Sequence, residues 1–155
     1  MMPGPVFADS DYVPLAESPL AWRWTDAAQH ALSASVLATI RPLTRGKAAD
    51  IYDLSLARCS QQSSNRQPRQ VQTDRDRSVV RTWLEDLAVG PSEPVILSWD
   101  ATTAVVTIWR TFLDHWDAFC YPASDDVAIW APACDWSLCY YHYEVLELSL
   151  GDAAA

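Results

Sequence analysis

The chain has 155 residues, of which half are hydrophobic and eight are Trp, and it carries a net charge of −9. This composition predicts one folded domain with a buried core, and it excludes a disordered chain or a membrane span of about 18 apolar residues. Residues 82–155 hold twelve acidic residues against one basic residue. That balance disfavours nucleic-acid binding and favours a basic partner or a merely soluble surface.

Residues 1–20 contain four prolines and predict an extended lead-in. The first 14 residues, "MMPGPVFADSDYVP", lack the basic and apolar regions of a secretion signal, so we expect a cytoplasmic protein with reduced cysteines. "WTDAAQHALSASVLATI" then predicts a helix that Pro42 ends, because apolar residues repeat every four positions. A second helix is expected from about Thr44 to Arg58, with Ala48, Ile51, Tyr52 and Leu56 on one side.

Residues 59–75 form the one low-complexity segment, which is polar and predicts a mobile surface loop. Arginines between positions 66 and 81 make this segment and its exit basic, which suits either an anion-binding arm or a solvated loop. A third helix is expected from about Asp76 to Ala88, before Gly90 and Pro91.

The pattern changes after Pro94. "VILSW" predicts a buried strand. The next segment is ambiguous because it is rich in β-branched residues, but its aromatics lie three, four and three positions apart. We therefore expect a helix from about Thr103 to Ala118 that buries an aromatic stripe made of Trp109, Phe112, Trp116 and Phe119.

Further strands follow. "VAIWA" predicts a strand, "PACD" a hairpin turn, and "WSLCYYHYEVLELSL" one or two more strands. Helices followed by a β-α-β-β order indicate a single α+β domain over residues 1–155, with a small, mainly antiparallel β-sheet and the aromatic-striped helix on it.

No metal or cofactor is expected. Cys134, Cys139 and His142 form a C-x4-C-x2-H cluster, but Cys139 and His142 would point to opposite faces of one strand. With four glycines in the chain, no phosphate-binding loop or dinucleotide fingerprint occurs.

The stretch "WDAFCYPASDD" between residues 116 and 126 concentrates the reactive residue types. An enzyme would have to use the neighbourhood of Cys120, Asp125, Asp126 and His142, although no glycine-rich oxyanion turn accompanies it. Adjacent aspartates after a proline also cap turns.

The same stretch suits a binding surface for a basic partner, because aromatic anchors beside carboxylates supply contact area and attraction. The candidate partner-binding residues are Asp114, Trp116, Asp117, Tyr121, Asp125, Asp126 and Glu144. The alternative is that Trp116 belongs to the core and that the carboxylates only solvate the turn.

The C-terminal half resembles a group of small bacterial proteins with a W-x2-F-x3-W-x2-F-C-Y-P-x-S-D-D segment followed by two aromatic-rich strands. "TIRPLTRGKAADIYDLSL" is similar to the N-terminal segment of a related family, with Tyr52 where that family tends to have Trp. The strand positions of the resemblance are Trp136, Tyr140, His142 and Glu144.

Several proteins of this group look like immunity proteins of polymorphic toxin systems. The resemblance implies a cytoplasmic antitoxin that binds a cognate toxin and covers its active site, without catalytic residues of its own. A small enzyme and a structural subunit of a larger assembly are the alternatives.

Overall fold

The computed structural model of the chain describes residues 5–62 and 69–150, apart from the side chains of residues 60–62. Two short 3-10 turns, Asp9–Asp11 and Leu15–Glu17, come first. The helices are α1 (Ala21–Thr25), α2 (Ala34–Leu37), α3 (Arg45–Gln62), α4 (Arg77–Glu85) and α5 (Trp109–Phe119). The strands are β1 (Arg41–Pro42), β2 (Arg69–Gln72), β3 (Pro94–Asp100), β4 (Thr103–Ile108), β5 (Val127–Trp130), β6 (Trp136–Tyr141) and β7 (Val145–Leu150).

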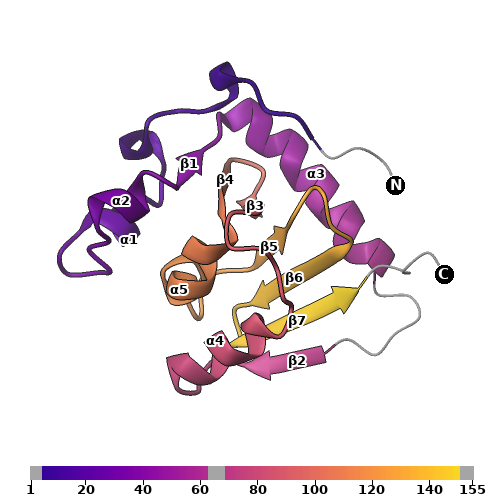
Figure 1. The fold of residues 1–155 in the computed structure, drawn as a ribbon. Helices are drawn as coiled ribbons and strands as arrows, with labels where there is room; N and C mark the ends of the chain where they lie inside the picture. Colours follow the sequence, from indigo (N-terminus) through magenta and orange to yellow (C-terminus); the bar gives the residue numbers. More distant parts are fainter. Residues whose placement is uncertain (1–4, 63–68, 151–155) are drawn as a thin grey trace.

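The strands form one seven-stranded sheet in the order β1-β4-β3-β5-β6-β7-β2. Every neighbouring pair is antiparallel, and β5, β6 and β7 follow one another as hairpins. Long α3 crosses one side of the sheet, whereas α4 and α5 lie on the other (Figure 1). The α+β class and the mainly antiparallel sheet predicted from the sequence are confirmed. Within the described residues, no helix is long and apolar enough to cross a membrane.

Alternate residues of the central strands enter two separate cores. In β3, Val95 and Leu97 join the cluster beneath α5, whereas Ile96 joins the cluster beneath α3. Strands β4 and β5 divide their apolar residues in the same way, because successive side chains of a strand point to opposite faces. The centre of the sheet is therefore apolar on both faces.

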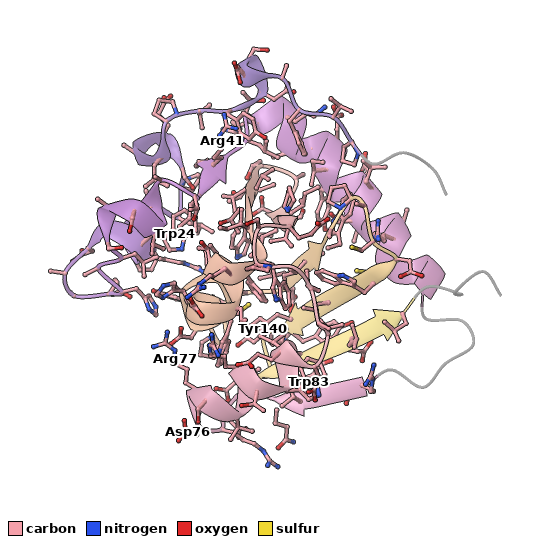
Figure 2. All side chains as sticks on the ribbon, in the orientation of Figure 1. Trp24, Arg41, Asp76, Arg77, Trp83 and Tyr140 are labelled. Atoms are coloured by element: carbon pink, nitrogen blue, oxygen red, sulfur yellow. The ribbon has the colours of Figure 1, made fainter. Side chains whose placement is uncertain are left out.

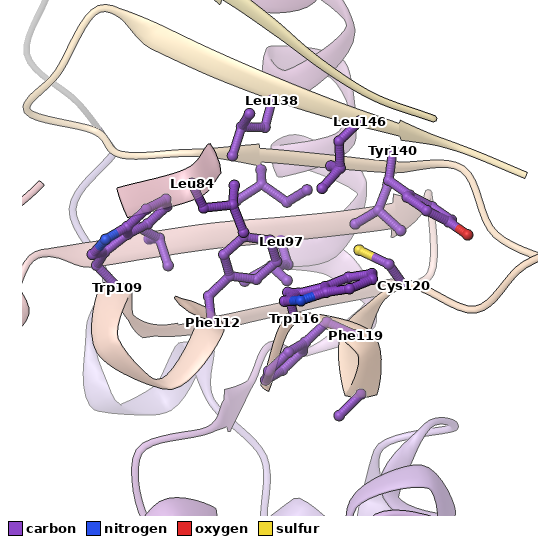
Figure 3. Packing of buried hydrophobic residues seen from close by; sticks show 14 of the residues in the cluster. Leu84, Leu97, Trp109, Phe112, Trp116, Phe119, Cys120, Leu138, Tyr140 and Leu146 are labelled. Atoms are coloured by element: carbon purple, nitrogen blue, oxygen red, sulfur yellow. The ribbon is translucent and has the colours of Figure 1, made fainter. Parts of the chain in front are cut away.

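The larger core lies between the sheet and α5 (Figure 3). All four aromatics of the predicted stripe are buried in it: Trp109, Phe112, Trp116 and Phe119. The ring of Phe112 lies between those of Trp109, at 5.7 Å, and Phe119, at 6.1 Å. The helical spacing of these aromatics was thus interpreted correctly from Trp109 onward.

The expected start of that helix at Thr103 is wrong. Residues 103–108 form strand β4, in which Val105 pairs with Leu97 and Val106 with Ile96. A strand buried on both faces carries apolar residues at consecutive positions, so it lacks the alternation that would have identified it. The β-branched residues were the better indicator.

The single helix expected over residues 24–40 is also wrong. The chain forms α1, turns, and starts again at α2, where the Ser33 hydroxyl accepts a bond from the Val36 amide. Ala31 lies in the left-handed region with φ 45°, which ends a helix. Trp24 is buried and donates its indole N–H to the Ala118 carbonyl at 3.0 Å, so tertiary contacts override the helical periodicity.

Helix α3 confirms the second predicted helix, but one residue of its predicted apolar side is exposed. Ala48 and Ile51 are buried as expected, but Leu56 is 52% exposed and Ser55 is buried instead. The helix also continues to Gln62, and residues 69–72 form β2, so the predicted loop over residues 59–75 is wrong at both ends. Its middle, residues 63–68, lies outside the described residues, as do residues 1–4 of the predicted lead-in.

The third helix starts where predicted, but it ends at Glu85 rather than at Ala88. The Asp76 carboxylate caps α4 by accepting the Ser78 amide at 3.0 Å. After the helix, Ala88 has φ 52°, a left-handed conformation that usually belongs to glycine at a helix C-terminus.

Phe112→Ala should lower the free energy of unfolding by about 3–5 kcal/mol, because it leaves a cavity inside the α5 core. Urea unfolding followed by tryptophan fluorescence measures the change. Leu54→Ala, on the exposed face of α3, serves as the control and should stay within about 0.5 kcal/mol of wild type. A small effect of Phe112→Ala would contradict the described core.

Ala88→Gly should raise the free energy of unfolding by about 0.5–1 kcal/mol, since glycine adopts a positive φ without strain. The same exchange at exposed Ala57, inside α3, should lower it by about 1 kcal/mol. Changes of the same sign in the two variants, measured by thermal unfolding, would refute the left-handed assignment at Ala88.

Candidate partner-binding surface

The "YPASDD" segment forms a turn between α5 and β5. The Asp125 amide donates to the Tyr121 carbonyl at 3.2 Å, and Ala123 takes a positive φ of 69°. The Ala123 amide donates to the His142 carbonyl at 2.9 Å, which joins this turn to the turn between β6 and β7. The turns on either side of the β5–β6 hairpin thus meet at one end of the sheet.

Asp125 lies in the interior, where it is 5% exposed. Arg23 of α1 donates two hydrogen bonds to its carboxylate, at 2.5 and 2.9 Å. The Tyr121 amide, the Ser124 hydroxyl and the Trp99 indole complete the set of donors, at 3.0, 3.0 and 3.3 Å. Burial alone would raise the pKa of Asp125, but the bonds from Arg23 and Tyr121 outweigh it and lower the pKa.

Trp116 and Cys120 are also interior residues (Figure 3). The Trp116 indole donates to the Arg77 carbonyl at 3.3 Å, and Cys120 lies beside Trp116 and Tyr140. Burial raises the pKa of the Cys120 thiol well above its ordinary value. Trp116 and Asp125 are each 5% exposed, so their expected places on an exposed binding surface need correction.

The acidic residues of α5 face arginines rather than open solvent. Asp114 accepts from Arg81 at 2.6 Å and lies 3.4 Å from Arg110, while Asp117 lies 3.4 Å from Arg77. Figure 2 shows Arg77 and Asp76 at the start of α4, on the α5 side of the sheet. The sequence suggested Asp114 and Asp117 as acidic partner-binding residues, but the structure gives a face of mixed charge. The signal that could have revealed part of it is the i,i+4 spacing of Arg110 and Asp114.

An exposed carboxylate and an exposed tyrosine lie instead around the turn between β6 and β7. The Asp126 side chain is 63% exposed, and its carboxylate accepts from the His142 backbone amide and contacts the His142 ring nitrogen Nδ1, both at 3.0 Å. Tyr143 is 61% exposed and stacks on Tyr141 with ring centroids 5.3 Å apart. Glu144 completes this turn with φ 67°. We call Asp126, Tyr141, His142, Tyr143 and Glu144 the turn surface.

Two neighbouring features extend the turn surface. Tyr121 is partly buried, donates to the Gln29 side chain at 2.9 Å, and stacks against Arg23, whose guanidinium carbon lies 4.0 Å from the ring centroid. On the α4 side, Glu144 borders a cavity of about 220 Å³ whose wall also contains Thr73, Arg75, Arg77, Trp116, Asp117, Cys120, Pro122 and Tyr140. Arg23, Tyr141 and Tyr143 were not among the residues predicted from the sequence.

The predicted C-x4-C-x2-H cluster is dispersed. His142 lies in the turn after β6 rather than inside a strand, and the Cys139 sulfur lies beside that of Cys59. Among the residues that the structure describes, no group of three or more His, Cys, Asp or Glu side chains could hold a metal ion.

No protein-family model, curated protein or solved structure matches the chain. Its function must therefore be inferred from the residues themselves and from their geometry.

Asp125→Asn should lower the free energy of unfolding by about 3–5 kcal/mol at pH 7, because it leaves the buried Arg23 charge unpaired. Glu85→Gln removes the exposed ion pair with Arg81 and should change stability by about 1 kcal/mol or less. Urea unfolding of both variants measures the difference.

The effect of Asp125→Asn on the free energy of unfolding should depend on pH. Since the folded pKa of Asp125 is lowered, its ionised form stabilises the fold above the unfolded pKa of about 3.9, and this stabilisation is lost as the pH falls toward the folded pKa. The gap between wild type and Asp125→Asn should therefore narrow below about pH 4. A gap that stays constant from pH 7 to pH 3 would contradict the ionised pair.

Proposed function

We propose that the protein acts by binding another protein, as a cytoplasmic immunity protein that covers the active site of a cognate toxin. The resemblance of the segment around Trp116 to immunity proteins suggests the toxin as the partner. The turn surface is the observation that carries the binding role, because exposed Tyr143, stacked on half-buried Tyr141, lies near the exposed Asp126 carboxylate at one end of the sheet.

The chemistry of the turn surface suits a basic partner. Tyrosine supplies rigid, amphipathic contact area and is enriched among the residues that dominate binding energy. The carboxylates of Asp126 and Glu144, together with the net charge of −9, attract a basic protein and repel nucleic acid. Many toxin domains that act on nucleic acids or nucleotides have such a basic active-site face.

Two residues on which the enzyme alternative depends are poorly placed for catalysis. Its nucleophile would be Cys120, whose thiol is enclosed in the core and has a raised pKa. A thiol in that state is a poor nucleophile. Asp125, its supposed acid or base, is occupied by Arg23. The exposed Asp126–His142 pair remains, and its bond to the His142 backbone amide orders the turn surface, which suits a binding role.

The experiment combines co-expression with binding kinetics. The proteins encoded beside this chain are expressed one by one in bacteria, with and without it. An immunity protein should restore growth against one of them and form a complex of defined stoichiometry in light scattering. If no neighbouring product is toxic and none is bound, the immunity role is wrong.

The interface is tested with a matched pair of triple variants. Asp126→Asn, Tyr143→Ala and Glu144→Asn together should weaken the complex about 30-fold or more, slow association and flatten its dependence on salt. Asp50→Asn, Asp53→Asn and Leu54→Ala on exposed α3 remove the same number of charges and one apolar side chain and should bind as wild type. Equal binding by both triple variants, with intact melting curves, would place the interface elsewhere, such as at the arginines around α4.

A further inference from the structure

Helix α3 contacts the sheet through one stripe of residues that ends at a cysteine. The Ser55 hydroxyl accepts the Trp130 indole N–H at 2.9 Å, and the Arg58 guanidinium carbon lies 4.8 Å from the centroid of the Trp130 ring. Arg58 also reaches the Trp136 carbonyl at 3.5 Å. Cys59 follows Arg58, so the last contact of this stripe falls on strand β6.

The Cys59 sulfur lies 2.8 Å from the Cys139 sulfur of β6. A disulfide bond is about 2.05 Å long, so the two atoms are less than an ångström from bonding distance. The two residues are 80 positions apart, and each belongs to a regular element whose backbone is fixed by its own hydrogen bonds. Both side chains are partly exposed. The contact is therefore a product of the fold and is open to small reagents.

The surroundings distinguish the two thiols. The hydrogen bond from Cys139 lowers the pKa of Cys59, with further lowering by the Ser137 hydroxyl and the Arg58 charge against the opposing effect of burial. The bond to Cys59 raises the pKa of Cys139, and burial adds to it. Cys59 is thus suited to act as the attacking thiolate, and Cys139 as the resolving thiol.

We propose that Cys59 and Cys139 form a reversible disulfide when the protein meets hydrogen peroxide. The Cys59 thiolate attacks one peroxide oxygen, the O–O bond breaks, and the leaving hydroxide takes a proton to become water. The Cys59 sulfenic acid is then attacked by the Cys139 sulfur, which loses its proton as the S–S bond forms and the sulfenic oxygen leaves as a second water. The sulfurs are oxidised and the peroxide is reduced, and a dithiol reductant reverses the change by thiol–disulfide exchange.

The other two cysteines lack this arrangement. The Cys134 sulfur lies 4.0 Å from a Glu93 oxygen, and burial and that carboxylate raise its pKa. Cys120 is enclosed in the α5 core. The bond would join α3 to β6 and close a loop of about 80 residues, so it should stabilise the fold substantially and raise the melting temperature by about 10 °C.

The experiment treats reduced wild-type protein with a small excess of hydrogen peroxide and compares it with an untreated sample. Non-reducing peptide mapping should find Cys59 linked to Cys139, titration should lose two of the four thiols, and the melting temperature should rise and then return after dithiothreitol. Cys134→Ser is the matched control and should behave as wild type. Peptide maps that show no Cys59–Cys139 link, or a link through Cys134, would overturn the proposal.

The order of the two steps is tested separately. In Cys139→Ser the peroxide should leave Cys59 as a sulfenic acid that dimedone labels, whereas in Cys59→Ser the dimedone label on Cys139 should be at least tenfold weaker. Equal labelling of the two variants would refute the assignment of Cys59 as the attacking thiol. The wild-type peptide map decides the proposal even if one serine variant fails to fold.

Discussion

The architecture depends on the burial of the central strands on both faces. Residues such as Ile96 and Leu97 are adjacent in β3 and equally buried, yet they point into different cores. Each face must be covered, which requires α3 on one side and α5 on the other (Figure 1). The two helices mainly cover β3, β4 and β5. The turn from β6 to β7 lies outside this covered region and has exposed side chains such as Tyr143. The candidate surface lies where the two-sided core ends.

The Arg23–Asp125 pair explains how two adjacent aspartates obtain opposite roles. Neighbouring side chains of an extended segment point to opposite sides, so an inward Asp125 directs Asp126 outward. The inward carboxylate is held by Arg23 of α1, which fastens the N-terminal part of the chain to the turn before β5. The outward one contacts His142 and thereby orders the turn surface. A buried ion pair adds little net stability, but it fixes the geometry around it, and the loss of one partner is costly.

The sequence predicted the elements whose signal is local. The capped α4, the aromatic spacing from Trp109 to Phe119 and the hairpins after Val127 all follow from short-range patterns. Strand β4 was mistaken for helix because a strand covered on both faces has no alternation. The pairing of Arg23 with Asp125 joins residues 102 positions apart, and no local pattern contains it. The burial of Trp116 and Asp125 and the exposure of Asp126 therefore required the tertiary structure.

Tyr141 links the thiol pair to the turn surface. Its ring stacks on exposed Tyr143 at an interplanar angle of 2°, and its hydroxyl bonds to the Cys139 sulfur. Burial, together with the neighbouring Cys139, raises the pKa of Tyr141, so its hydroxyl stays protonated and serves as a donor at neutral pH. Oxidation removes the negative charge that a Cys59 thiolate brings to the pair, so the disulfide is a weaker acceptor for this hydroxyl. Formation of the proposed disulfide would weaken the bond that holds Tyr141 while it fastens α3 to β6. The stacked rings of Tyr141 and Tyr143 would then differ in mobility between the reduced and the oxidised protein. Strand β6 thereby connects the thiol pair to the turn surface.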